Sequence, residues 1–182
     1  CAPLTVTFEE MSQRATTYAW NYGDATTASG LNDTAHEHTF ELEGFDLISR
    51  AVTLTVEAEG GCTDAHTLAV EVYPEVVANP VGALEGCAPW QSDLTAEGYA
   101  GASNHNITWT LPEGDTFEGV DLQRTFVGLG GQDEELTLGL SITSPFGCQA
   151  HSTVTATVHH TPVSDFTLSD MAACAGTEIA LL

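Results

Sequence analysis

The chain has 182 residues, of which 42% are hydrophobic, and it carries a formal net charge of −23 with no lysine. Three arginines cannot neutralise a row of phosphates, so the charge excludes nucleic acid and an anionic membrane surface as partners. No apolar run approaches the ~20 residues of a membrane-spanning helix, so direct membrane insertion is not expected.

Short segments rich in β-branched and aromatic residues follow one another along the first half of the chain. Most of them alternate between apolar and polar residues, and stretches of Gly, Asp, Asn and Ser separate them. No segment predicts a helix. The predicted strands are Leu4–Glu10, Thr17–Tyr22, His38–Gly44, Ala51–Ala58 and His66–Tyr73.

The second half of the chain repeats this plan. An opening strand is expected between Pro74 and Cys87, and another between Pro162 and Cys174, because each proline ends the pairing of the strand before it. The segments that match the earlier strands are Asn106–Leu111, Arg124–Gly128, Leu136–Cys148 and His151–His160.

The five cysteines have the same period as the strands. Cys1 and Cys87 are 86 residues apart, and Cys87 and Cys174 are 87 apart. Cys62 follows Cys1 by 61 residues, and Cys148 follows Cys87 by 61 residues. A fixed period of this kind is typical of a domain array, which also explains the odd number of cysteines. A lipid-bearing Cys1 would not account for the copies in phase with it.

The predicted fold is therefore all-β, with tandem immunoglobulin-like antiparallel β-sandwiches in a head-to-tail array. Residues 1–74 form a repeat that lacks its first strand, residues 75–161 form a complete and diverged repeat, and residues 162–182 begin a third. We expect the natural protein to be longer than this chain, because both incomplete repeats would leave sheet edges open.

The first repeat carries a motif of eight residues, Trp20, Tyr22, Gly23, Asp24, His38, Thr39, Phe40 and Gly44. With this motif it resembles a PKD (polycystic kidney disease) domain, and the cysteines around it resemble those of tandem PKD repeats in large surface proteins of Bacteroidota. Such proteins are exported through type IX secretion and serve as adhesins or gliding-associated proteins. The second repeat keeps only part of the motif, at Trp109, Gly114, Asp115, Thr125 and Phe126.

Periodic cysteines without a metal-type CxxC favour disulfides and an oxidising compartment. Two pairings are open. Pairing within a repeat would join Cys1 to Cys62 and Cys87 to Cys148. Successive strands of an antiparallel sandwich run in opposite directions, and this alternation, called strand parity below, places Cys1 and Cys62 at opposite ends of a repeat. The two ends are ~20 Å apart, whereas bridged Cα atoms lie within ~7 Å. Strand parity therefore favours a link between repeats, Cys1 with Cys148, and leaves the partner of Cys174 outside the chain.

Other candidate sites are less specific. Asp24, Asp33 and Asp133 lie in acidic loops whose oxygens could bind calcium, although turn capping is the favoured interpretation of Asp24. Thr34 is a candidate O-glycosylation acceptor in an Asp-Thr-Ala motif, and Asn32 and Asn106 match the Asn-x-Thr sequon. The paired histidines are interpreted as surface or strand residues rather than metal ligands. They are His36, His38, His159 and His160.

No catalytic motif is present, so no enzymatic activity and no cofactor other than calcium are expected. The leading hypothesis is a structural spacer of a giant extracellular adhesin or surface filament, located at the bacterial cell surface. Its partners would be neighbouring repeats of the same polypeptide and other copies in a fibre. The alternative is an accessory module of a secreted hydrolase that binds a glycan, a protein or a surface receptor.

Overall fold

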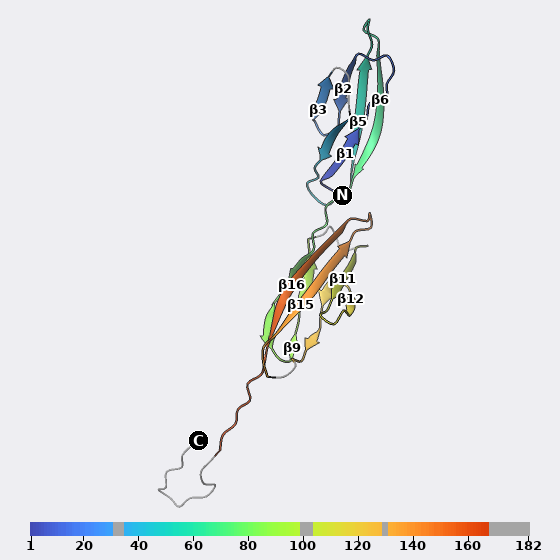
Figure 1. The fold of residues 1–182 in the computed structure, drawn as a ribbon. Coiled ribbons are helices and arrows are strands. Elements are labelled where there is room, and N and C mark those ends of the chain that lie inside the picture. The colour runs from blue at the N-terminus through green and yellow to red at the C-terminus, as the bar shows by residue number, and fades with distance from the viewer. Residues whose placement is uncertain (31–34, 99–103, 129–130, 168–182) are drawn as a thin grey trace, which may run out of the picture.

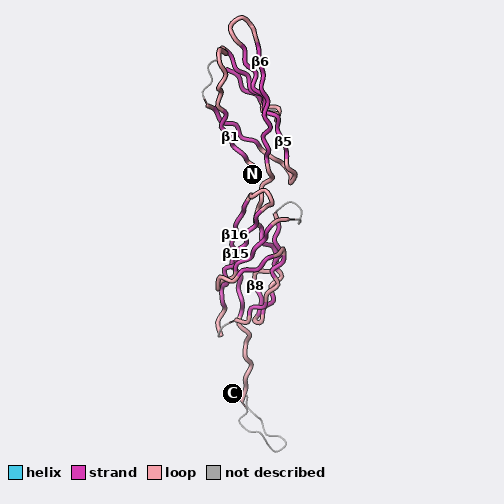
Figure 2. The backbone as a smooth tube through the Cα atoms, turned by 90° about the vertical axis from the view of Figure 1, so that its right-hand side faces the viewer, coloured by secondary structure: helices cyan, strands magenta, loops and turns pink. Residues whose placement is uncertain are grey.

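The computed structural model describes residues 1–30, 35–98, 104–128 and 131–167. These residues form strands and loops, with no helix among them. Two β-sheet bodies follow one another along one long axis, and an extended segment leaves the far end of the second body (Figure 1). The view turned by 90° shows the same end-to-end arrangement (Figure 2).

The first body, called the first repeat (residues 1–74), has two facing sheets. One is an antiparallel pair of β1 (Leu4–Phe8) and β4 (His36–Phe40). The other has the order β3-β2-β5-β6, all antiparallel. Its strands are β2 (Thr17–Asn21), β3 (Thr27–Gly30), β5 (Ile48–Glu57) and β6 (Thr63–Val72).

The second repeat (residues 75–161) is built on a larger sheet of order β12-β11-β15-β16-β8. This sheet comprises β8 (Glu85–Cys87), β11 (Asn106–Thr110), β12 (Thr116–Glu118), β15 (Glu134–Thr143) and β16 (Gln149–His159). Two smaller sheets, β13-β10-β7 and β14-β9, complete the body. Their strands are β7 (Asn79–Val81), β9 (Trp90–Gln91), β10 (Leu94–Glu97), β13 (Asp121–Leu122) and β14 (Thr125–Phe126).

Strand registers repeat between the two bodies. Leu4 pairs with Phe40 in the first repeat, and Trp90 pairs with Phe126 in the second, so both partners move on by 86 residues. The long hairpin β5–β6 of the first repeat corresponds to the hairpin β15–β16 of the second, with the same offset of 86 residues. Positions that correspond by this offset are called counterparts below. For β2 and β11 the offset is 89, because Trp20 opposite Leu54 corresponds to Trp109 opposite Leu140.

The two cores differ in extent. Trp109 is fully buried in the second repeat, whereas Trp20 is only partly buried in the first. The buried apolar residues of the first repeat are Ala2, Tyr22, Phe40, Val52 and Val72. Those of the second are Val76, Trp90, Leu94, Ala96, Ile107, Trp109, Leu111, Leu122, Phe126, Leu136, Leu138, Leu140, Ile142, Cys148, Ala156 and Val158.

The structure confirms an all-β fold and corrects several predicted strands. The strand expected at His38–Gly44 ends at Phe40, and residues 41–44 form a loop. The opening strand before Cys87 is split: β7 pairs with β10, and β8 crosses to pair in parallel with β16. Pattern alone did not predict β3, β12 or β13, because each is an edge strand of four residues or fewer.

Candidate functional site

A disulfide joins the two repeats where they meet. It links Cys1 at the start of the first repeat to Cys148 in the turn between β15 and β16, with the two Cα atoms 5.8 Å apart. This is the pairing between repeats that strand parity favours. The alternative within a repeat is wrong for this structure, since Cys62 and Cys87 are both unpaired and exposed.

The connecting chain is held at the same junction. The backbone N–H of Ala2 donates to the carbonyl oxygen of Tyr73 at 2.7 Å, which ties the first residues to the end of β6. The Tyr73 ring stacks on Phe146 with centroids 4.6 Å apart, and Pro74 between the repeats is buried. The junction therefore combines a covalent link, a ring stack and a buried linker.

Sequence reasoning missed the two aromatic residues of this junction. Phe146 lies two residues before Cys148, in the turn Ser144-Pro145-Phe146-Gly147-Cys148, and Tyr73 directly precedes Pro74. An aromatic side chain at the tip of a tight turn was the available signal, because it indicates a contact that the isolated repeat does not supply.

The turn that presents Cys148 has a counterpart at the opposite end of the first repeat. Ser144 N–H donates to the Cys148 carbonyl at 2.8 Å, and Ala58 N–H donates to the Cys62 carbonyl at 2.9 Å. Cys62 thus lies in a turn of the same form between β5 and β6 (Figure 1). Cys87 is the counterpart of Cys1, and the Ala88 N–H donates to the His159 carbonyl as Ala2 donates to Tyr73.

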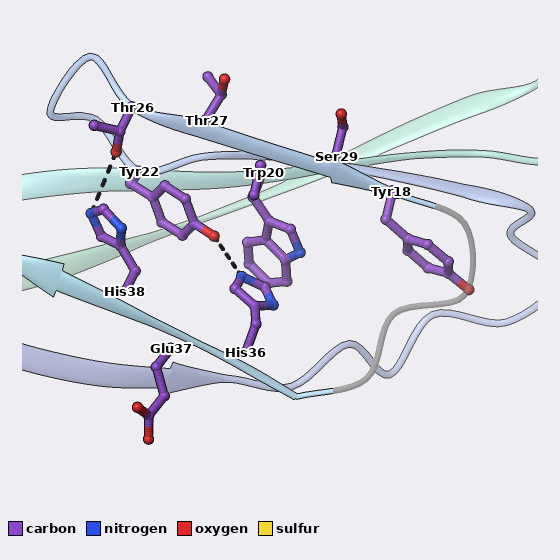
Figure 3. Close-up of a pocket in the computed structure, with 11 residues that line it drawn as sticks. Tyr18, Trp20, Tyr22, Thr26, Thr27, Ser29, His36, Glu37 and His38 are labelled. Carbon is purple, nitrogen blue, oxygen red and sulfur yellow. Dashed lines mark hydrogen bonds between the residues drawn. The ribbon is translucent and has the colours of Figure 1, made fainter.

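A second site is an aromatic and histidine cluster on the first repeat. It lines a cavity of about 510 Å³ between β4 and the β2–β3 hairpin (Figure 3). Tyr22 and His36 share a hydrogen bond of 2.5 Å, and the Tyr22 ring stacks on His38 with centroids 3.9 Å apart. The counterparts of Tyr22 and His36 in the second repeat are Leu111 and Leu122, which are buried. The first repeat therefore has polar ring atoms where the second has only aliphatic groups.

Asp24 caps the turn between β2 and β3 and contacts this cluster. Its Oδ1 accepts from the Thr26 N–H at 3.0 Å and from the Thr26 hydroxyl, and its Oδ2 accepts from His38 Nε2 at 2.7 Å. Partial burial acts to raise the pKa of Asp24, but the hydrogen bonds from Thr26 and His38 outweigh it and lower this pKa to about 2. Gly23 precedes it at φ 75°, where a Cβ would lie 2.7 Å from the Ala51 carbonyl oxygen, so only glycine fits.

Asp133 joins the two histidines at the far end of the second repeat. Its Oδ2 accepts from His159 Nδ1 at 2.9 Å, and its Oδ1 accepts from the His160 backbone N–H and Nδ1. The hydrogen bonds from His159 and His160 hold the pKa of Asp133 well below its usual range. The same bond to Asp133 raises the pKa of His159.

The calcium candidates are not brought together in the described part of the chain. Asp24 and Asp133 belong to different repeats, and both carboxylates already accept hydrogen bonds. Among the described residues, no group of three His, Cys, Asp or Glu side chains could hold a metal ion. Asn106 is exposed at the start of β11. Asn32, Asp33, Thr34 and Cys174 lie outside the described residues.

No protein-family model and no curated protein matches this chain. Within the residues that the structure describes, no helix is long and apolar enough to cross a membrane.

Proposed function

We propose that this chain is a spacer segment of an extracellular array, in which PKD-type repeats are stapled end to end and transmit load. The observation that carries the proposal is the junction. Cys1–Cys148, the Tyr73–Phe146 stack and the buried Pro74 restrain one hinge in three independent ways. Relative motion is the default for domains joined by a short linker, so a junction restrained in this way favours a role that needs stiffness.

The wider features of the chain support an exterior location. A disulfide between repeats persists in an oxidising compartment. The net charge of −23 keeps an extended chain soluble and self-repelling. The resemblance to tandem PKD repeats of bacterial surface proteins agrees with an adhesin stalk or a surface filament whose partners are its own neighbouring repeats.

Small-angle X-ray scattering on the purified chain tests the spacer role. Oxidised protein is expected to give the profile of one elongated conformer, and Cys1→Ser is expected to broaden the distribution of distances between the repeats. Cys87→Ser is the matched control, because Cys87 is the counterpart of Cys1 and has no partner in this chain. Identical profiles for wild type and Cys1→Ser, both with a wide distribution, would contradict the stiff junction.

The aromatic cluster of the first repeat favours a second candidate function, recognition of a glycan. Aromatic faces beside hydroxyl and imidazole groups offer both stacking and hydrogen bonds to a sugar, and Trp20, Tyr22 and His36 supply them in one cavity (Figure 3). Binding of a glycan panel followed by tryptophan fluorescence tests this function. A binding signal that survives His36→Leu, the residue found at the counterpart position, would place recognition elsewhere.

A further inference from the structure

The second repeat holds a cation at the place where the first repeat has the cavity of its aromatic cluster. The guanidinium carbon of Arg124 lies 5.2 Å from the centroid of the Phe117 ring. A guanidinium over an aromatic face is attracted by the charge distribution of the ring. Arg124 is the counterpart of His38 by the offset of 86 residues. Phe117 is the counterpart of Ala28, because each pairs with the tryptophan of its own repeat on the neighbouring strand.

Both replacements make room in the first repeat. Ala28 and His38 line the cavity of about 510 Å³, and each is smaller than the residue at its counterpart position. The second repeat uses the same two positions for an aromatic ring and a cation of its own. The protein itself therefore shows which chemistry this part of the fold accommodates.

The walls of the cavity suit a positive charge. Tyr18, Trp20 and Tyr22 at alternate positions of β2 supply aromatic rings along one wall (Figure 3). The rings of Trp20 and Tyr22 are within 5° of parallel, with centroids 6.5 Å apart. Aromatic faces attract cations, and no lysine or arginine is among the described residues that line the cavity. The net charge of −23 also draws cationic partners to the chain.

Hydrogen-bond acceptors complete the match. Asp24 Oδ2 accepts from His38 Nε2 at 2.7 Å, and the Asp24 carboxylate is ionised at neutral pH because its pKa is lowered to about 2. A neutral imidazole that donates through Nε2 has an acceptor at Nδ1. The hydroxyl oxygens of Thr26 and Thr27 in the lining can accept as well. A guanidinium has five donors and no acceptor, so a wall of this kind is complementary to it.

We propose that this cavity binds the guanidinium group of an arginine side chain that a partner protein with a basic surface presents. The arginine would take in the first repeat the place that Arg124 has in the second. The inference goes beyond the spacer role, because it gives one repeat of the array a docking site for another protein. A neutral sugar would need the same space, so the test includes one.

A titration of the full chain followed by NMR tests the ligand chemistry. The probes are a peptide blocked at both ends with one arginine as its only charge, and the same peptide with citrulline, which keeps the shape and loses the charge. The arginine peptide is expected to shift the signals of the Trp20 indole and the His38 ring, and to bind about tenfold more tightly than the citrulline peptide. Low salt is used, because salt screens a partly exposed charge. Equal affinities, or no binding of the arginine peptide at millimolar concentrations, would overturn the proposal.

Two variants copy the second repeat into the first. Ala28→Phe fills the cavity with a ring and His38→Arg puts a cation of the chain into it, so each is expected to weaken binding of the arginine peptide about tenfold or more. Ala19→Phe is the matched control, because Ala19 is exposed on β2 and does not line the cavity. Circular dichroism checks that all three variants are folded. Unchanged binding in both Ala28→Phe and His38→Arg, or equal weakening by Ala19→Phe, would contradict the site.

A neutral sugar separates this inference from glycan recognition. Maltohexaose added in place of the peptide is expected to leave the Trp20 and His38 signals unchanged. Binding of the sugar that Ala28→Phe abolishes, together with no binding of the arginine peptide, would assign the cavity to a glycan and overturn the inference. None of these results depends on the stiffness of the Cys1–Cys148 junction, so the spacer role stands or falls by its own test.

Discussion

Removing the Cys1–Cys148 link should destabilise the second repeat. When the second repeat unfolds and the first stays folded, Ala2 remains bound to Tyr73, so the disulfide closes a loop that runs from Tyr73 to Cys148. That loop has about 75 residues, for which the chain-entropy model gives roughly 4.5 kcal/mol at 25 °C. Measured effects of native disulfides are commonly about 2–5 kcal/mol.

Cys1→Ser is the suitable variant, because Cys1 is exposed while Cys148 is buried. Urea denaturation of oxidised wild type and of Cys1→Ser, followed by tryptophan fluorescence and circular dichroism, gives the difference in free energy of unfolding. Cys62→Ser is the control, since Cys62 is unpaired and its removal should leave the transition unchanged. A Cys1→Ser transition within about 0.5 kcal/mol of wild type would refute the reasoning, since an effect that small is ordinary for a surface change.

Three further predictions concern the two repeats separately. Leu140→Ala should lower the free energy of unfolding of the second repeat by about 2–5 kcal/mol, because Leu140 is 2% exposed. The counterpart change Leu54→Ala should lower that of the first repeat clearly less, because Leu54 lines an open cavity of about 550 Å³. Equal losses in urea denaturation would contradict this difference between the two cores. Asp24→Ala should lower the stability of the first repeat by about 1–2 kcal/mol at pH 7, after allowance for solvent screening. Because the pKa of Asp24 is lowered to about 2, this contribution is present above the ordinary value near 3.8 and is lost as the pH falls through about 2. Thermal melts of wild type and Asp24→Ala across that pH range check it. A difference in stability that does not change with pH would contradict the lowered pKa of Asp24. His159 should titrate by NMR with a pKa above its ordinary value. Its bond to Asp133 therefore stabilises the folded second repeat fully below pH 6.5, and this stability is lost as the pH rises through the higher folded pKa. An unchanged His159 titration in Asp133→Asn would show that the bond does not form in solution.

The sequence by itself determined the local features of this protein. Alternation of apolar and polar residues placed the long strands β5, β6 and β16 to within three residues at each end, because the period of side chains along a strand is a property of the chain alone. The strand predicted at Leu136–Cys148 was too long, because β15 ends at Thr143 and the turn to β16 follows it. The spacing of the cysteines indicated two cycles of one pattern, and the structure repeats the strand registers with the same offset of 86 residues. The turn-capping interpretation of Asp24 also followed from its position after Gly23.

Only the tertiary structure decided how distant segments meet. The choice between pairings for Cys1 depended on which ends of two sandwiches face each other, and strand parity could favour an answer without excluding the other. The cluster of Tyr22, His36 and His38 was not predicted, because a tyrosine on one strand and two histidines on another come together only when the two sheets close over each other. The exposure of Leu68 was likewise not predicted, since its place in the alternation of β6 is that of a core residue, yet it is 64% exposed among the described residues.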